Sequence, residues 1–179
     1  MLAIALAGDP QLLIADEPTT ALDVTIQAQI IELLASLQAD MGMGLILISH
    51  DLAVVRDVAD TVVVMYAGRV AESGSCREVL EHPRHPYTDG LLAAAPQFTA
   101  QPGVRFVTMA GASSTGPDAI GGCAFAPRCS NRIDRCTTDL PPAIGAAGGE
   151  LAAHRSACWV PIGVDAPADA DDLGATARV

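Results

Sequence analysis

The sequence predicts an α/β fold in which two parallel strands are joined by a crossover helix. Two short apolar runs, at residues 12–15 and 45–48, each follow a loop and end in polar residues, a pattern typical of parallel strands buried on both faces. Between them, apolar residues recur at helical spacing, at positions 26, 30, 33, 34 and 37. Strand, helix and strand in this order indicate a right-handed crossover.

The remaining elements follow from local patterns. Asp23 is a good cap for the free amides of the helix that follows it, which should run for about four turns. Residues 61–66 and 69–73 predict a hairpin around a turn at Ala67 and Gly68. Three further helices are expected, at residues 52–59, 75–81 and 87–95.

A change of composition predicts a domain boundary after residue 95. Residues 96–122 are rich in Gly, Pro, Ser, Ala and Thr, and only residues 104–109 resemble a strand. We therefore expect three parts: residues 1–95, a small cysteine-containing extension at 96–160, and a disordered tail at 161–179, which has almost no large apolar side chain.

Charge and hydropathy narrow the function classes. The net charge is −11, and residues 1–60 contain nine acidic residues but only Arg56 as a base, which disfavours nucleic-acid binding. Mean hydropathy is +0.35, yet no apolar run reaches the roughly 18 residues that a membrane span needs. No secretory leader is evident. The sequence therefore predicts a cytosolic location.

Polar side chains follow both predicted strands. Asp16 and Glu17 end the first run and His50 ends the second, where open sheets of this type bind ligands. A carboxylate there can hold the magnesium of a nucleotide, a second can orient or deprotonate an attacking water, and a histidine can contact the terminal phosphate. Each feature by itself is also typical of ordinary strand ends and helix caps.

Together, the strings LLIADEPTTALD at residues 12–23 and ISHD at 48–51 resemble the ABC ATPase family. The resemblance implies that Asp16 is the Walker B aspartate, which binds magnesium with ATP, and Glu17 the catalytic glutamate. It also implies that His50 is the switch histidine and that Ala21, Leu22 and Asp23 form the D-loop. The fold expected is then the C-terminal part of an ABC-type P-loop ATPase domain.

Two further strings, MYAGR at 65–69 and HPYT at 85–88, look like the oligopeptide and dipeptide importer ATPases and their nickel-importing relatives. The resemblance covers residues 1 to about 159. As local chemistry, HPYT is a proline-started helix with an exposed cap at His85, and we treat it as a family marker without a catalytic role.

Family members carry, upstream of this region, a glycine-rich phosphate loop with a lysine, a glutamine loop and a signature motif. None is present here, and all ten basic residues of the chain are arginine. Without a lysine the chain cannot supply the phosphate loop. The chain as given is therefore expected to be inactive alone, and its origin as a gene-model artefact or a real fragment stays open.

Four of the five cysteines, Cys123, Cys129, Cys136 and Cys158, lie in the predicted extension, and their spacing differs from the usual zinc pattern. The strings GCAFAPRC at 122–129 and HRSAC at 154–158 resemble the terminal extension of peptide-importer ATPases, some of which bind a [4Fe–4S] cluster. Such a cluster is the favoured reading, with zinc and free thiols as alternatives. His154 would be a surplus ligand, Cys76 belongs to ordinary packing, and nearby arginines would offset the negative charge.

The resemblance implies an ATPase that energises peptide uptake at the cytoplasmic face of the membrane. It would act with permease subunits, with a second ATP-binding subunit in a homo- or heterodimer, and indirectly with an extracytoplasmic solute-binding protein. The solute could be oligopeptide, dipeptide, nickel or another. One alternative is an inert fragment whose cysteine extension is a structural or redox module. Another, an ABC-type ATPase of DNA repair, is opposed by the acidic charge, HPYT and the extension.

Overall fold

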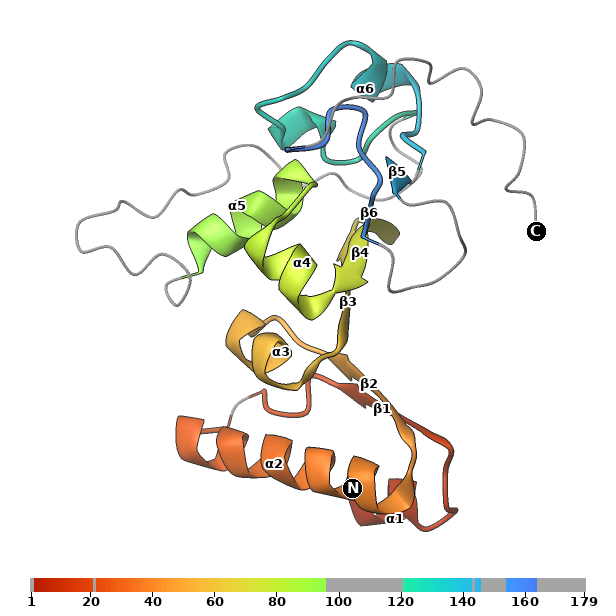
Figure 1. The fold of residues 1–179 in the computed structure, drawn as a ribbon, viewed down its shortest axis with the longest axis vertical. Helices are drawn as coiled ribbons and strands as arrows, with labels where there is room; N and C mark the ends of the chain where they lie inside the picture. Colours follow the sequence, from red (N-terminus) through yellow and green to blue (C-terminus); the bar gives the residue numbers. More distant parts are fainter. Residues whose placement is uncertain (1, 21, 96–120, 143, 146–153, 164–179) are drawn as a thin grey trace. The chain divides into compact units, whose positions relative to one another are not determined.

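The computed structural model of the 179-residue chain describes residues 2–20, 22–95, 121–142, 144–145 and 154–163 (Figure 1). The chain divides into two compact units, Met1–Ala59 and Asp60–Val179. The predicted boundary after residue 95 falls within the second unit and stays a prediction. The D-loop residue Ala21, the predicted strand at 104–109 and most of the predicted tail lie outside the described residues.

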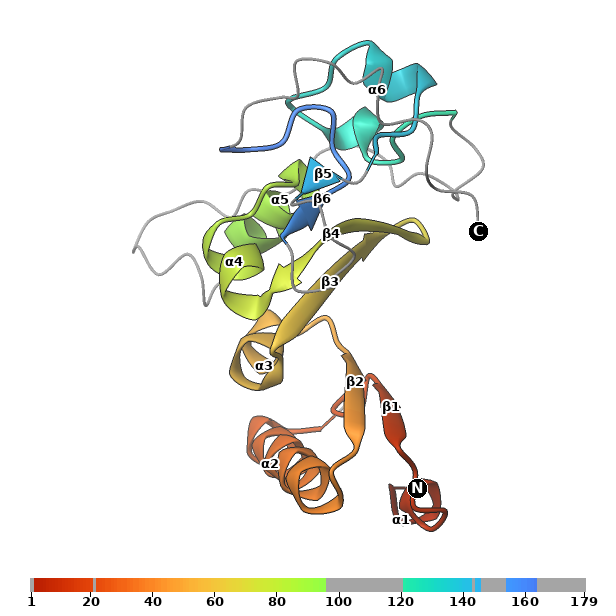
Figure 2. The same ribbon diagram turned by 45° about the vertical axis from the view of Figure 1, so that its right-hand side comes forward.

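The first unit has the predicted parallel crossover. Strands β1 (Leu12–Asp16) and β2 (Gly44–Ile48) pair in parallel and lie side by side in both views (Figures 1 and 2). Helix α2 (Val24–Met41) joins them, and its 18 residues make about five turns, one more than predicted. It begins after Asp23 and ends at Gly42, which has a left-handed φ of 63°. Helices α1 (Leu2–Leu6) and α3 (Leu52–Val58) complete the unit.

One face of the β1–β2 pair is packed and the other is open. Leu13 on β1 is buried with Leu34 and Met43, and apolar side chains of α1 and α2 pack around them. On the other face of the sheet, four large apolar side chains are between 46% and 61% exposed: Leu12, Ile14, Ile46 and Ile48. The expectation that both faces are buried is therefore wrong for this structure, because the described helices cover only one of them.

The second unit is built on a four-stranded antiparallel sheet of order β3-β4-β6-β5. Strands β3 (Thr61–Tyr66) and β4 (Arg69–Ser75) form the predicted hairpin. Ala67 and Gly68 have φ of 48° and 77°, and two left-handed residues in a two-residue turn match the right-handed twist of a hairpin. Strands β5 (Ile144–Gly145) and β6 (Arg155–Ser156) come from the predicted extension, and β6 pairs with β4.

Two capped helices follow the hairpin. Helix α4 (Cys76–Glu81) begins after Ser75, whose hydroxyl accepts a hydrogen bond from the Glu78 N–H at 3.3 Å. Helix α5 (Pro86–Ala94) begins after His85, whose Nδ1 accepts a bond from the Tyr87 N–H at 3.0 Å. The cap at His85 was expected to be exposed, and this is wrong: His85 is only 3% exposed, because the sheet and the extension cover it.

The extension has a small core of its own. A 3-10 helix (Ala126–Arg128) and helix α6 (Arg135–Thr138) lie in it, and Ala126, Cys136 and Trp159 are buried together. The Arg135 guanidinium lies 3.9 Å from the centre of a Trp159 ring, a cation–π contact. In neither unit is a described helix both long and apolar enough to cross a bilayer.

Candidate functional site

The candidate site lies where β1 and β2 end side by side. Asp16, the last residue of β1, pairs with Ile48, the last residue of β2. The Glu17 N–H then donates to the Ile48 carbonyl at 2.9 Å, which extends the pairing by one residue. Because both strands run the same way, Asp16, Glu17 and His50 emerge at the same edge of the sheet, as the sequence predicts.

Glu17 and His50 are in direct contact. The His50 Nδ1 donates to the Glu17 carboxylate, with distances of 2.8 Å to Oε2 and 2.9 Å to Oε1. The Thr20 hydroxyl donates to Glu17 Oε2 at 2.7 Å. The hydrogen bond from His50, followed by that from Thr20, lowers the pKa of Glu17, and the same contact raises the pKa of His50. At neutral pH the carboxylate is therefore ionised and held in one orientation.

The backbone at Glu17 is unusual. Its φ is 49°, in the left-handed region that residues with a side chain adopt at a cost of about 1–2 kcal/mol. Such strain gathers at functional sites. Here the left-handed turn is held by the bonds of Glu17 to Ile48 and Thr20, and the carboxylate lies in contact with His50.

The other acids of the motif occupy different positions. Asp16 is exposed at the end of β1. Asp23 caps α2, and its Oδ1 accepts from the Thr25 and Ile26 N–H groups at 3.0 Å. Asp23 thus has a structural role in this chain beside the D-loop role that the resemblance implies.

Sequence reasoning assigned no role to Asp51, yet this residue ties the His50 loop to α2. Its Oδ2 accepts from the Gln27 amide at 2.8 Å, and its Oδ1 accepts from the Ala53 N–H at 3.0 Å, which caps α3. Burial acts to raise the pKa of Asp51, but these hydrogen bonds outweigh it and lower the pKa. Asp51, the residue that follows His50, therefore anchors the loop that contains His50 to α2 and to the start of α3.

The edge can perform acid–base chemistry on a bound ligand. The His50 side chain is 78% exposed and the Glu17 side chain 38% exposed, so both are accessible from solvent. An exposed ion pair of this kind contributes little to stability. An ionised carboxylate, oriented by two donors and placed beside a strand-end aspartate, is suited to accept a proton from a water.

The four cysteines of the extension are near one another but form no metal site. Burial, with smaller contributions from Cys129, Cys123 and Cys136, raises the pKa of Cys158 to about 12. Burial is also the main cause that raises the pKa of Cys123 and Cys129. Yet no group of three His, Cys, Asp or Glu side chains in the described part of the chain, which includes all five cysteines, could hold a metal ion. The predicted metal centre is therefore not supported by the structure.

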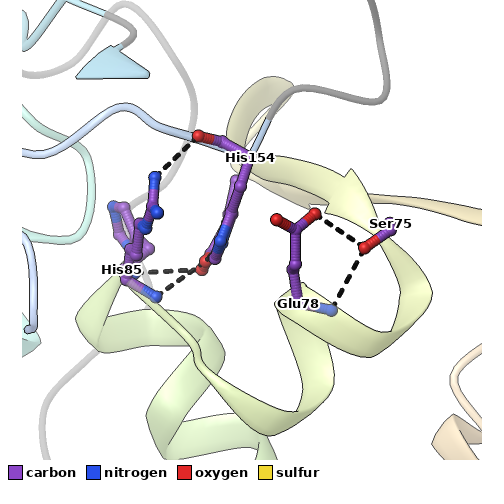
Figure 3. Close-up of polar contacts among 6 residues, drawn as sticks. Ser75, Glu78, His85 and His154 are labelled. Atoms are coloured by element: carbon purple, nitrogen blue, oxygen red, sulfur yellow. Dashed lines mark hydrogen bonds and ion pairs between the residues drawn. The ribbon is translucent and has the colours of Figure 1, made fainter. Parts of the chain in front are cut away.

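A buried carboxylate that sequence reasoning missed joins the extension to the hairpin. Glu72 on β4 is 1% exposed. Its Oε1 accepts from the Arg84 N–H at 2.7 Å and from His154 Nε2 at 2.7 Å, and its Oε2 accepts from the His85 N–H at 2.9 Å. The Arg84 guanidinium in turn donates to the His154 carbonyl at 2.8 Å. We name Glu72, Arg84, His85 and His154 the Glu72 cluster, and Figure 3 labels His85 and His154 of this cluster.

The Glu72 cluster corrects one expectation about His154. This histidine was considered as a surplus metal ligand, but its Nε2 is engaged by Glu72 and the residue is 5% exposed. The only sequence signal for the cluster is an acid within a strand, and that signal also fits a solvent-facing position. The partners are 12 to 82 residues away along the chain.

The first unit thus has the form of a parallel α/β ligand-binding domain, with two carboxylates and a histidine at one edge of its sheet. Comparisons with known proteins concern the chain as a whole. The family model for the oligopeptide/dipeptide transporter, C-terminal region, matches residues 71–136. A protein of Brucella ovis named for peptide import and ATP binding is 49% identical over 146 residues, which are 79% of this chain and 43% of that protein.

Two other relatives agree. The dipeptide transport ATP-binding protein DppD of Escherichia coli K12 is 48% identical over 162 residues, 90% of this chain and 48% of that protein. The oligopeptide transport ATP-binding protein OppD of Mycobacterium tuberculosis H37Rv is 47% identical over 158 residues, 88% of this chain and 25% of that protein. The chain belongs to this oligopeptide/dipeptide transporter family of ATP-binding subunits, and it spans less than half the length of these relatives.

Proposed function

We propose that this chain carries the hydrolytic edge of an ATP-hydrolysing subunit of an ABC importer that energises the uptake of oligopeptides or dipeptides. The single observation that carries the proposal is the Glu17–His50 contact of 2.8 Å at the joined ends of β1 and β2. The relatives named for peptide import and ATP binding support the same activity.

Each side chain at the edge has a role in this proposal. Asp16 holds magnesium together with the phosphates of ATP. Glu17 orients the attacking water and accepts its proton. Its lowered pKa keeps the carboxylate ionised at neutral pH, and its two hydrogen-bond donors hold it in place. His50 contacts the terminal phosphate, and Asp23 belongs to the D-loop next to the partner subunit.

The proposal also assigns partners. The phosphate-binding loop and its lysine come from another part of the complete subunit, since this chain has no lysine. Two such subunits act as a pair at the cytoplasmic face of the membrane, docked on two permease subunits, and an extracytoplasmic binding protein delivers the solute.

Peptide uptake by a chimera tests this function. The matched 162 residues of the Escherichia coli dipeptide protein are replaced by those of this chain, in cells that lack their own copy. We expect the chimera to restore uptake of a labelled dipeptide, and Glu17→Gln to abolish it. Glu32→Gln, an exposed position on α2, is the matched control. Equal uptake with Glu17→Gln and with the control would refute the proposal.

We further propose that Cys123, Cys129, Cys136 and Cys158 bind a [4Fe–4S] cluster, with zinc as the alternative metal. The mutual electrostatic influence of their thiols indicates that the four cysteines are near one another, and Cys123 and Cys136 belong to the small core of the extension. Because the thiols are not arranged as a metal centre, binding requires a rearrangement of the extension.

Reconstitution with iron and sulfide without oxygen tests the cysteine proposal. We expect a brown protein with broad visible absorbance, and loss of this absorbance when any of the four cysteines is changed to serine. Cys76→Ser, outside the group, is the control and should leave the colour intact. A colourless protein containing stoichiometric zinc supports the alternative metal, and a folded, metal-free protein sinks both.

A further inference from the structure

A pocket of about 310 Å³ lies in the second unit, between the hairpin turn and the cysteine extension. Its lining is mainly apolar and includes Val70, Phe125 and Leu140, all of them within the described residues. Clefts lined by apolar side chains with a few polar groups are the usual form of small-molecule sites. At roughly 30 Å³ per water, a pocket of this size holds a ligand of about ten non-hydrogen atoms.

Two polar side chains that line the pocket have no hydrogen-bond partner among the described residues, and they come from one cross-strand pair. Tyr66 and Arg69 are directly opposite each other on β3 and β4, so their side chains share a face of the sheet. The Tyr66 hydroxyl is buried and has no hydrogen-bond partner among the described residues, and a buried hydroxyl without a partner is unfavourable. Arg69 is exposed at the pocket.

The third polar side chain of the pocket is already satisfied. The Nδ1 atom of His85 accepts from the Tyr87 N–H at 3.0 Å. Burial lowers the pKa of His85 to about 4, so the ring is neutral at physiological pH. It contributes an apolar face beside Phe125, 5.9 Å between ring centres, and leaves Arg69 as the positive charge of the pocket.

We propose that this pocket binds a small aromatic carboxylate, whose ring packs on Phe125 and Leu140 and whose acid group pairs with the exposed Arg69. A small turn of the Tyr66 ring then brings its buried hydroxyl to the same acid group. The aromatic body fits the apolar lining, and the anion supplies the acceptor that the Tyr66 hydroxyl lacks. The site lies within the second unit, and the proposal does not depend on ATP hydrolysis. Its failure would leave the proposed function untouched.

A titration of the full chain with 3-phenylpropionate tests the proposal. Binding is monitored by the chemical shifts of the backbone amides. This acid has a ring, a short chain and a carboxylate, and about the required number of non-hydrogen atoms. Two analogues divide its features: 3-phenylpropanol lacks the charge and propionate lacks the ring. We expect saturable shifts at residues of the hairpin turn and the 3-10 helix, and an affinity about fivefold or more above that of either analogue.

Variants then locate the binding. Arg69→Gln should remove the preference for the acid over the alcohol. Tyr66→Phe should weaken the acid about threefold to tenfold, and it removes only a hydroxyl that has no partner to lose. Arg77→Gln, on the exposed side of α4, is the matched control and should change nothing. Three results would overturn the proposal: no saturable shift at 10 mM (about the weakest binding of interest), equal affinity for acid and alcohol, or shifts centred elsewhere.

Discussion

The Glu72 cluster allows the sharpest prediction about stability. Replacing Glu72 by Gln keeps the shape of the side chain but removes its charge and one of its two acceptor oxygens. The Gln carbonyl can still accept from the Arg84 N–H and from His154, in place of Oε1. Its amide then faces the His85 N–H, which loses its acceptor within a buried site.

The cost follows from these contacts. A hydrogen bond to a charged group contributes about 1.5–3 kcal/mol, and a buried donor left without its acceptor costs about 1–3 kcal/mol. We therefore expect Glu72→Gln to lower the free energy of unfolding of the second unit by about 3 kcal/mol. Glu81→Gln is the control, because Glu81 is 56% exposed in a pair with Arg77, and such pairs contribute less than about 0.5 kcal/mol.

Urea unfolding followed by tryptophan fluorescence measures this cost. Trp159 is the only tryptophan, it is 8% exposed, and its Nε1 donates to the Asp139 carbonyl at 3.1 Å. Its emission therefore reports on the extension that the cluster holds. If Glu72→Gln shifted the midpoint no more than Glu81→Gln does, the cluster would not join the extension to the hairpin as described.

Three further predictions concern pH, backbone packing and nucleotide binding. Because burial lowers the pKa of His85 to about 4, the unfolded chain takes up a proton below about pH 6.5 while the folded chain does not. The free energy of unfolding measured in urea should therefore fall from pH 7 to pH 4, by up to about 3 kcal/mol, and a flat profile would contradict this. Gly122→Ala should disorder the extension and redden Trp159 emission, since a Cβ there would collide with the Cys136 carbonyl; Gly8→Ala, with open space around it, is its control. The chain as given should show no micromolar ATP binding in calorimetry and no phosphate release above background, because it has no lysine and its residues 1–60 are strongly acidic.

The parallel crossover and the hairpin could be predicted from the sequence because their signals are local. These signals are an apolar run of four or five residues, a helix cap at Asp23 and a glycine in the hairpin turn. Each depends only on residues that are close along the chain. Parallel pairing then brings Asp16, Glu17 and His50 to one edge. The contact between Glu17 and His50 goes one step further, since it depends on the left-handed φ of Glu17, which no pattern in the sequence indicates.

The second unit was harder to predict because its contacts are distant in sequence. Glu72 and His154 are 82 residues apart, and the strand that contains Ser156 has only two residues, too few for an alternating pattern. The burial of His85 depends on Phe125 in the extension. An acidic residue within a strand can be buried and hydrogen-bonded or exposed to solvent. The local sequence does not show which of the two applies, because the fold decides it.

Phosphate release by the purified chimera, with and without Glu17→Gln, tests the central claim most directly. The claim is that the Glu17–His50 edge acts on the water that attacks bound ATP. We predict that Glu17→Gln leaves ATP binding within about twofold while turnover falls by about 10²-fold or more, and that Glu32→Gln changes neither. Unchanged turnover with Glu17→Gln, or binding and turnover that fall together, would contradict the account.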